Sequence, residues 1–329
     1  MPTDIDQLAE IIKKSNQKFH NAQKEMHRII VGQEHVINRL FVSLLADGHI
    51  LLEGLPGLAK TLAVTSLAKV IQCEYKRIQF TPDLLPADLI GTSIYNPKEG
   101  TFQVSKGPIF TNLLLADEIN RAPAKVQSAL LEVMQERQVT ISGETYQVSR
   151  PFLVLATQNP IEHEGTYPLP EASTDRFMMK VRIDYPTPEE EGEIMRRMGV
   201  LGKPPEANAV LTGNDILEAR KLINDIYVDD KVTQYILDIV FATRYPGKFG
   251  IPIDDLILYG ASPRASLSLM IAGKAQAFLK GRGYVTPHDI KEIAHDVLRH
   301  RIRRTYEAEA EEISPDDLID KILGTIPVP

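Results

Sequence analysis

The feature that most constrains the fold is a glycine-rich loop between an apolar run and a helix-forming run. HILLE (49–53) precedes the loop GLPGLAKT (54–61), and TLAVTSLAKVI (61–71) follows it with the composition of a buried helix. A loop in this setting aims successive backbone N–H groups at one point beside a helix N-terminus, where the helix dipole also favours negative charge. The arrangement predicts a phosphate-binding site.

One position departs from the usual loop pattern, G-x-x-x-x-G-K-[ST]. Ala59 stands where the pattern has glycine before lysine. It adds one methyl group, which a helix start with negative φ accepts. We expect Lys60 to reach the β and γ phosphates and the Thr61 hydroxyl to bind Mg²⁺. The predicted nucleotide-binding residues of the loop are Gly54, Leu55, Pro56, Gly57, Leu58, Ala59, Lys60, Thr61 and Leu62.

Short apolar runs alternate with helical patterns along the first part of the chain. The runs are HILLE (49–53), KRIQF (76–80), NLLLA (112–116), FLVLAT (152–157) and FMMKVRI (177–183). This alternation predicts an α/β fold with a parallel five-stranded sheet flanked by helices. Residues 93–104 and 138–148 instead show paired alternating runs around turn residues, so they are predicted to be β-hairpins.

A segment rich in proline and glycine, residues 198–209, has no periodicity and is predicted to be a linker. Helical spacing follows it over 214–226, 229–244, 263–281 and 286–301. We predict two domains. Residues 1–205 would form the α/β nucleotide-binding domain, with a helical lead-in and the two hairpins, and residues 206–329 a smaller all-α lid.

Composition restricts the location and the partners of the protein. No apolar run approaches the roughly 18 residues that span a bilayer, so direct membrane insertion is not expected. The N-terminal residues mix charges through their apolar positions, unlike a secretion signal. Cys73 is the single cysteine, which suits a reducing compartment, and we expect a soluble cytoplasmic protein. The net charge of −7 argues against a dedicated nucleic-acid binder.

Polar residues suited to phosphoryl transfer follow two later strands. Asp117 and Glu118 end LLLADE, where Asp117 can hold Mg²⁺ and Glu118 can orient or deprotonate the attacking water. Asn159 ends FLVLATQN and can hydrogen-bond the γ-phosphate or that water. Arg176 and Arg264 offer guanidinium groups for the charge of the transition state. The predicted cofactors are therefore ATP and Mg²⁺.

This ordered set of motifs resembles the AAA+ ATPases and, within them, the MoxR family over almost the whole chain. The matching segments are IIVGQEHVINRL (29–40), GLPGLAKT (54–61), LLLADEINRAPAKVQSALLEVMQERQVT (113–140), ATQNP (156–160), EASTDRF (171–177), GASPRASLSL (260–269) and YVTPHDIKEIAHDVLRHRI (284–302). Alanine before the lysine is a common form in this family. The resemblance therefore implies that the phosphate loop is intact.

The resemblance also implies a role for each matching position. Adenine contacts fall on Val31, Gly32 and Gln33, Walker A on Lys60 and Thr61, Walker B on Asp117 and Glu118, and sensor 1 on Asn159. Arg176 matches the arginine finger, which reaches the nucleotide of the neighbouring subunit, and Arg264 matches sensor 2. Thr174 stands where the family motif is usually apolar, and Arg121 is a second candidate for the contact in trans.

The implied activity is ATP hydrolysis by a homo-oligomer, a hexameric ring, that remodels, assembles or matures partner proteins in a chaperone-like way. The two hairpins correspond to inserts that face the central pore of related rings. MoxR-type ATPases are often associated with proteins that carry a von Willebrand factor A domain. We expect such an adaptor, with its client, to be a separate polypeptide.

Two alternative functions stay open. A nucleic-acid motor with the same hairpins should carry basic tips that follow the phosphate backbone. The first hairpin has Lys98 and Lys106, whereas residues 140–148 of the second have neither lysine nor arginine. A nucleotide-binding switch that hardly hydrolyses is the other alternative, but a switch needs neither Glu118 nor Arg176.

Overall fold

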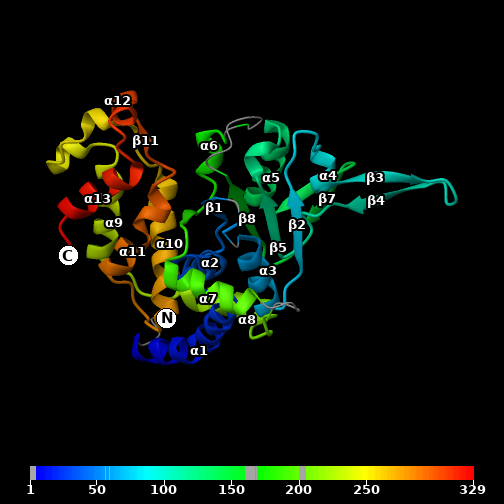
Figure 1. Cartoon of the computed structure of the whole chain (residues 1–329), viewed down its shortest axis with the longest axis horizontal. Coiled ribbons are helices and arrows are strands. Elements are labelled where there is room, and N and C mark those ends of the chain that lie inside the picture. Colours follow the sequence, from blue (N-terminus) through cyan, green and yellow to red (C-terminus); the bar gives the residue numbers. More distant parts are fainter. Residues whose placement is uncertain (1–4, 56, 59, 160–166, 168, 200–204) are drawn as a thin grey trace.

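A computed structural model describes residues 5–55, 57–58, 60–159, 167, 169–199 and 205–329 of the chain (Figure 1). A five-stranded sheet in the order β2-β5-β8-β1-β9, with every pair parallel, forms its centre. Its strands are β1 (Ile50–Gly54), β2 (Tyr75–Gln79), β5 (Leu113–Asp117), β8 (Leu153–Gln158) and β9 (Met179–Ile183). The predicted α/β class and all five predicted strands are confirmed.

Helices cover both faces of the sheet, as the apolar strands require. One face packs on α1 (Ile5–Ile29), α2 (Glu34–Leu45) and α3 (Lys60–Val70), and the other on α4 (Pro86–Ile90) and α5 (Ala124–Glu136). Successive residues of β5 join opposite cores, so Leu113 and Leu115 face α3 while Leu114 and Ala116 face α5. A continuous apolar run is therefore buried on both sides.

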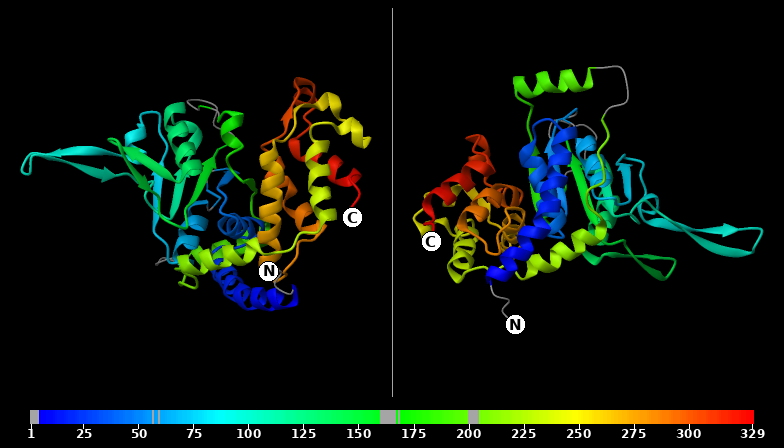
Figure 2. Two further views of the ribbon diagram at one scale, coloured as in Figure 1. Left: turned by 180° about the vertical axis from the view of Figure 1, so that it is seen from behind. Right: turned by 90° about the horizontal axis from the view of Figure 1, so that it is seen from below.

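Both predicted hairpins are present. The first pairs β3 (Gly91–Asn96) with β4 (Thr101–Lys106) and projects far from the body of the molecule in all views (Figures 1 and 2). The second pairs β6 (Gln138–Ile141) with β7 (Glu144–Gln147). Its turn residues Ser142 and Gly143 both have positive φ, which matches the right-handed twist of the strands.

The helical part follows the sheet in sequence and confirms the four predicted helices. They are α8 (Gly213–Asn224), α9 (Asp230–Ala242), α10 (Pro263–Leu279) and α11 (Pro287–Leu298). The remaining elements are η1 (Ile119–Arg121), α6 (Glu171–Thr174), α7 (Pro188–Met198), η2 (Pro246–Phe249), η3 (Asp254–Leu256), β10 (Ile257–Tyr259), β11 (Arg303–Arg304), α12 (Tyr306–Ala310) and α13 (Pro315–Thr325). The predicted boundary at residue 205 directly follows residues 200–204, which lie outside the described part, and it stays a prediction.

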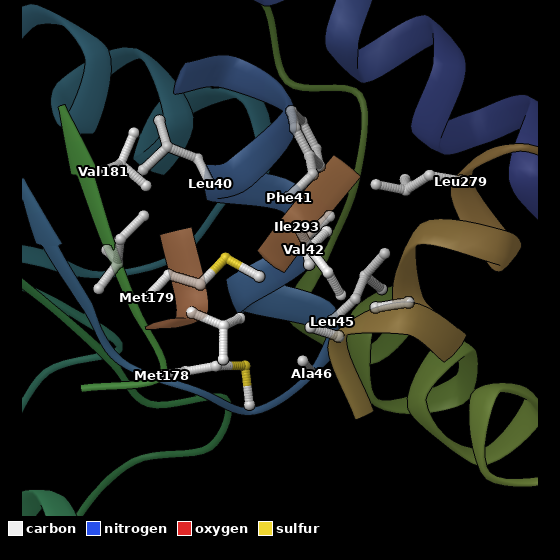
Figure 3. Close-up of a cluster of buried hydrophobic side chains, with 14 of the residues drawn as sticks. Leu40, Phe41, Val42, Leu45, Ala46, Met178, Met179, Val181, Leu279 and Ile293 are labelled. Carbon is white, nitrogen blue, oxygen red and sulfur yellow. The ribbon is translucent and has the colours of Figure 1, made fainter. Parts of the chain in front are cut away.

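Helix α2 joins the sheet to the helical part. Figure 3 shows its side chains between Met179 of β9 and Leu279 of α10, with Ile293 of α11 next to Phe41 and Val42. Helix α1 adds a second contact, because the rings of Phe19 and Phe278 lie 5.3 Å apart, edge to face. One continuous apolar core therefore runs from the sheet into the lid helices.

A buried carboxylate reinforces this junction. Asp296 of α11 is fully buried and accepts hydrogen bonds from Arg39 Nε at 2.6 Å and Arg299 Nη1 at 2.7 Å, with His35 Nε2 at 3.0 Å. Burial raises the pKa of Asp296, but the hydrogen bond and charge of His35 and the charges of both arginines outweigh it and lower the pKa to about 2.

No helix in the described part is long and apolar enough to cross a membrane.

His49 is a buried histidine at the entry to β1. Its Nδ1 accepts the backbone N–H of Val154 at 2.9 Å, and its Nε2–H donates to the carbonyl of Met134 at 3.1 Å. Burial, together with the charge of Arg137, lowers the pKa of His49 to about 3. Folding therefore requires the neutral imidazole.

This requirement predicts acid sensitivity of the fold. The unfolded histidine has a pKa near 6.5, so only the unfolded chain binds this proton between about pH 6.5 and 3. The contribution of His49 to stability is complete above that range and falls as pH drops, by about 2 kcal/mol at pH 5. Urea unfolding should show that His49→Gln is less stable at neutral pH but loses less stability on acidification. Equal losses in both proteins would contradict the assignment.

Candidate nucleotide site

The phosphate loop lies between β1 and α3, as the sequence predicts. Gly54 is required by close approach, because a Cβ there would lie 2.9 Å from the carbonyl oxygen of Ile183. Gly57 has φ +86, which favours glycine, and faces open space. Lys60 Nζ donates to the carbonyl of Gly54 at 2.7 Å, at the opposite end of the loop. Pro56 and Ala59 lie outside the described residues.

Asp117 is positioned by two neighbouring strands. Thr157 Oγ1 of β8 donates to its Oδ1 at 2.6 Å, and Arg77 Nη2 of β2 donates to its Oδ2 at 2.7 Å. The same Thr157 hydroxyl oxygen accepts the backbone N–H of Glu118 at 2.8 Å. One threonine therefore fixes both acidic residues, and motif matching alone did not identify it or Arg77.

Glu118 has an unusual backbone conformation, with φ 55 and ψ 51 in the left-handed region. Such strain at a non-glycine residue persists where surrounding contacts hold it, often at functional sites. Its Oε2 accepts hydrogen bonds from Gln79 Nε2 at 2.7 Å and Arg121 Nη1 at 3.0 Å. Arg121, the second candidate for a contact in trans, here binds a carboxylate of its own chain.

One cavity of about 340 Å³ brings two predicted catalytic residues, Glu118 and Asn159, together with residues of the phosphate loop and the predicted metal ligands. Its lining consists of Gly57, Lys60, Thr61, Leu62, Asp117, Glu118 and Asn159. Thr61 and Asp117 supply oxygen atoms to the same space, and Mg²⁺ in nucleotide sites commonly takes one or two protein oxygens together with phosphates and waters. The donor set fits a magnesium nucleotide. The described residues contain no cluster of three or more His, Cys, Asp or Glu side chains that would bind a metal without phosphates.

The residues predicted to contact adenine lie at the start of α2, beside the loop. Gly32 has φ +64, and a Cβ there would lie 2.2 Å from Glu190 Oε1. Gln33 lines a nearly filled apolar pocket whose other walls are Ile30, Val36, Ile37, Leu58, Ala63 and Ile183. Leu58 belongs to the phosphate loop, so this pocket adjoins the phosphate site. The side chains that line this pocket must move apart to admit a purine ring. Val31 does not line the pocket.

Arg176 and Arg264 lie elsewhere. They line a different cavity of about 240 Å³, which shares no residue with the cavity around Lys60. Arg264 Nη1 lies 3.5 Å from Asp175 Oδ2, while the side chain of Arg176 is exposed and bonds to no other residue in the described part of the chain. The structure therefore groups four predicted catalytic and metal-binding residues with Lys60 and separates the two arginines from them.

Comparisons with known proteins agree with this architecture. A family model described as the ATPase family associated with various cellular activities (AAA) matches residues 49–179, and an AAA lid domain matches residues 253–322. The Mycobacterium tuberculosis protein named chaperone MoxR1 is 52% identical over 306 residues, which cover 93% of this chain and 81% of that protein. The MoxR protein of Paracoccus denitrificans is 32% identical, over 95% of this chain and 96% of that protein.

A solved structure extends the similarity to three dimensions. The crystal structure of a provisionally assigned ATPase from Cytophaga hutchinsonii superposes with a TM-score of 0.92 at 52% identity and covers 98% of both chains. Sequence relatives, family models and this structure agree with the fold described above. The chain belongs to the MoxR family of AAA+ ATPases, and it is an enzyme that hydrolyses ATP.

Proposed function

We propose that the protein hydrolyses Mg·ATP as a homo-oligomeric ring, in the hexameric form that is typical of related ATPases, with each active site shared between two subunits. The observation that carries the proposal is the separation of Arg176 and Arg264 from the cavity that holds Lys60 and Glu118. Phosphoryl transfer needs positive charge at the γ-phosphate in the transition state. The arginines of a neighbouring subunit would supply that charge.

The residues of the cavity have distinct roles in this proposal. Lys60 would bind phosphate oxygens in place of the carbonyl of Gly54, and Thr61 and Asp117 would hold Mg²⁺, which when bound would neutralise charge on the β and γ phosphates. Glu118 would exchange its partners Gln79 and Arg121 for the attacking water and orient it, and Asn159 would donate to the γ-phosphate. Thr157 would keep the Asp117 carboxylate and the Glu118 backbone in place, so only the Glu118 side chain would change partners.

The first prediction separates ATP binding from hydrolysis. Lys60→Ala should abolish ATP binding, because the phosphates lose their point charge. Glu118→Gln should bind ATP but lose turnover by roughly 10²-fold to 10⁴-fold, because the amide cannot take a proton from the water. Lys69→Ala, at the exposed end of the same helix, is the matched control and should resemble wild type. Unchanged turnover in both Lys60→Ala and Glu118→Gln would refute the site.

The second prediction concerns sharing of the site. Arg176→Ala should lower turnover by about 10³-fold or more. An equimolar mixture of Arg176→Ala and Glu118→Gln should recover activity, because about a quarter of the interfaces in a random ring combine an intact Glu118 with an intact Arg176. Turnover per wild-type subunit should rise with protein concentration. Wild-type turnover in Arg176→Ala, independent of concentration, would favour a self-contained site.

The task of the ring would be chaperone-like remodelling, assembly or cofactor maturation of partner proteins in the cytoplasm. A relative at 52% identity is named a chaperone, which supports this proposal. The projecting hairpin exposes Ile94, Tyr95 and Phe102, and the two aromatic rings lie 5.2 Å apart. Exposed apolar groups on a projecting element suit contact with a polypeptide. A separate von Willebrand factor A domain protein would act as the adaptor that delivers the client.

The hairpins argue against a nucleic-acid motor. Lys106 lies at the base of the first hairpin, with its Nζ 5.0 Å from the ring centroids of both Phe110 and Tyr146, so a protein contact engages it. Lys98 is the one lysine in the turn region. Binding of single-stranded and double-stranded DNA should therefore be weak in a salt series followed by fluorescence anisotropy. Tight binding that falls steeply with salt would support the nucleic-acid alternative.

A further inference from the structure

The segment that carries Arg176 is held by two consecutive residues of the lid. Arg301 Nη2 donates to the carbonyl of Phe177 at 2.7 Å, and His300 Nε2–H donates to the same oxygen at 3.1 Å. Arg301 Nη1 donates to the carbonyl of Met178 at 3.0 Å. Burial lowers the pKa of His300 well below its usual value, which keeps the ring neutral.

Arg301 also reaches the residue before Arg176. Its Nε donates to Asp175 Oδ1 at 2.7 Å, and its Nη2 lies 3.2 Å from the Asp175 carbonyl oxygen. One guanidinium therefore bonds the chain on both sides of Arg176, whose own side chain remains exposed. The side chain of Arg301 is only 2% exposed, so these bonds are shielded from water.

Asp175 extends the same support to the second arginine. Its Oδ2 accepts a hydrogen bond from Ser262 Oγ at 2.9 Å and lies 3.5 Å from Arg264 Nη1. Ser262 is the N-cap of α10 and also accepts the backbone N–H of Arg264. The Asp175–Arg301 pair thus links the segment that carries Arg176 to the side chain of Arg264.

We propose that Arg301 is a positioning residue for the arginines that one subunit offers to its neighbour. The inference rests on the proposed shared active site. It makes the lid of each subunit act on the ATP of the next subunit rather than on its own. Since misplacing a catalytic group by about 1 Å costs roughly 100-fold in rate, Arg301→Gln should lower turnover by about that factor while ATP binding persists.

Mixtures of variants locate the site on which Arg301 acts. Mixed with Glu118→Gln, Arg301→Gln should recover activity, because its own cavity is intact and its partner offers well-placed arginines. Mixed with Arg176→Ala, it should recover nothing, since neither subunit presents a competent arginine. The opposite pattern, recovery with Arg176→Ala but not with Glu118→Gln, would mean that Arg301 serves its own nucleotide site and would overturn the proposal.

A neighbouring arginine provides the control for general damage to the lid. Arg299 is also largely buried and binds Asp296, Asp316 and the carbonyl of Lys180, but within the described part of the chain it does not bond to residues 175–178. Arg299→Gln should lower thermal stability and keep turnover within a few-fold of wild type. If Arg299→Gln lost as much turnover as Arg301→Gln and showed the same mixing pattern, the effect would come from general weakening of the contact between the lid and the sheet domain, and Arg301 would have no specific positioning role.

A second variant covers the case in which Arg301→Gln fails to fold. Asp175 is the more exposed residue of the Asp175–Arg301 pair. Asp175→Asn keeps the size of this side chain and removes the charge that pairs with Arg301 and Arg264. It should show the same mixing pattern as Arg301→Gln. Wild-type turnover in Asp175→Asn and Arg301→Gln, with Arg176→Ala inactive, would overturn the positioning role alone. Wild-type turnover in Arg176→Ala itself would overturn the shared site and the inference with it.

Discussion

The buried guanidinium of Arg301 joins the lid to residues 175–178, which directly precede β9, the last strand of the sheet. A buried charge is stable only when it is paired and its N–H groups are satisfied, and here Asp175 and backbone carbonyls of the sheet domain satisfy them. The lid therefore cannot move away from this segment without leaving a charge unpaired. The nucleotide cavity is lined by the phosphate loop, the start of α3 and residues at the carboxyl ends of β5 and β8.

The sequence was sufficient to predict the parts whose signals are local. Five apolar runs, the phosphate loop and four helices after residue 212 were correctly placed, because strand and helix periodicities and glycine-rich turns each depend on a few neighbouring residues. The convergence of Lys60, Asp117, Glu118 and Asn159 was also predictable. Parallel strands end at one edge of the sheet, so polar residues at their carboxyl ends must meet there.

The parts that sequence patterns missed depend on contacts between distant segments. Thr157 resembles any strand residue until β8 pairs with β5 and places its hydroxyl between Asp117 and Glu118. Arg301 lies 126 positions after Asp175, and no local pattern indicates that it is buried there. Similarly, the apolar pocket beside Gln33 is nearly closed, a property set by side-chain packing.

The central claim is that each active site is complete only across two subunits, with Arg176 of the segment held by the lid and Arg264 of the lid serving the neighbour. The most direct measurement is a cryo-electron microscopy map of Glu118→Gln with ATP and Mg²⁺. The account predicts a ring in which Lys60 of one subunit and Arg176 of the next both contact the γ-phosphate, with the Asp175–Arg301 pair intact. A nucleotide bound by Lys60 and by Arg176 or Arg264 of the same chain would contradict it.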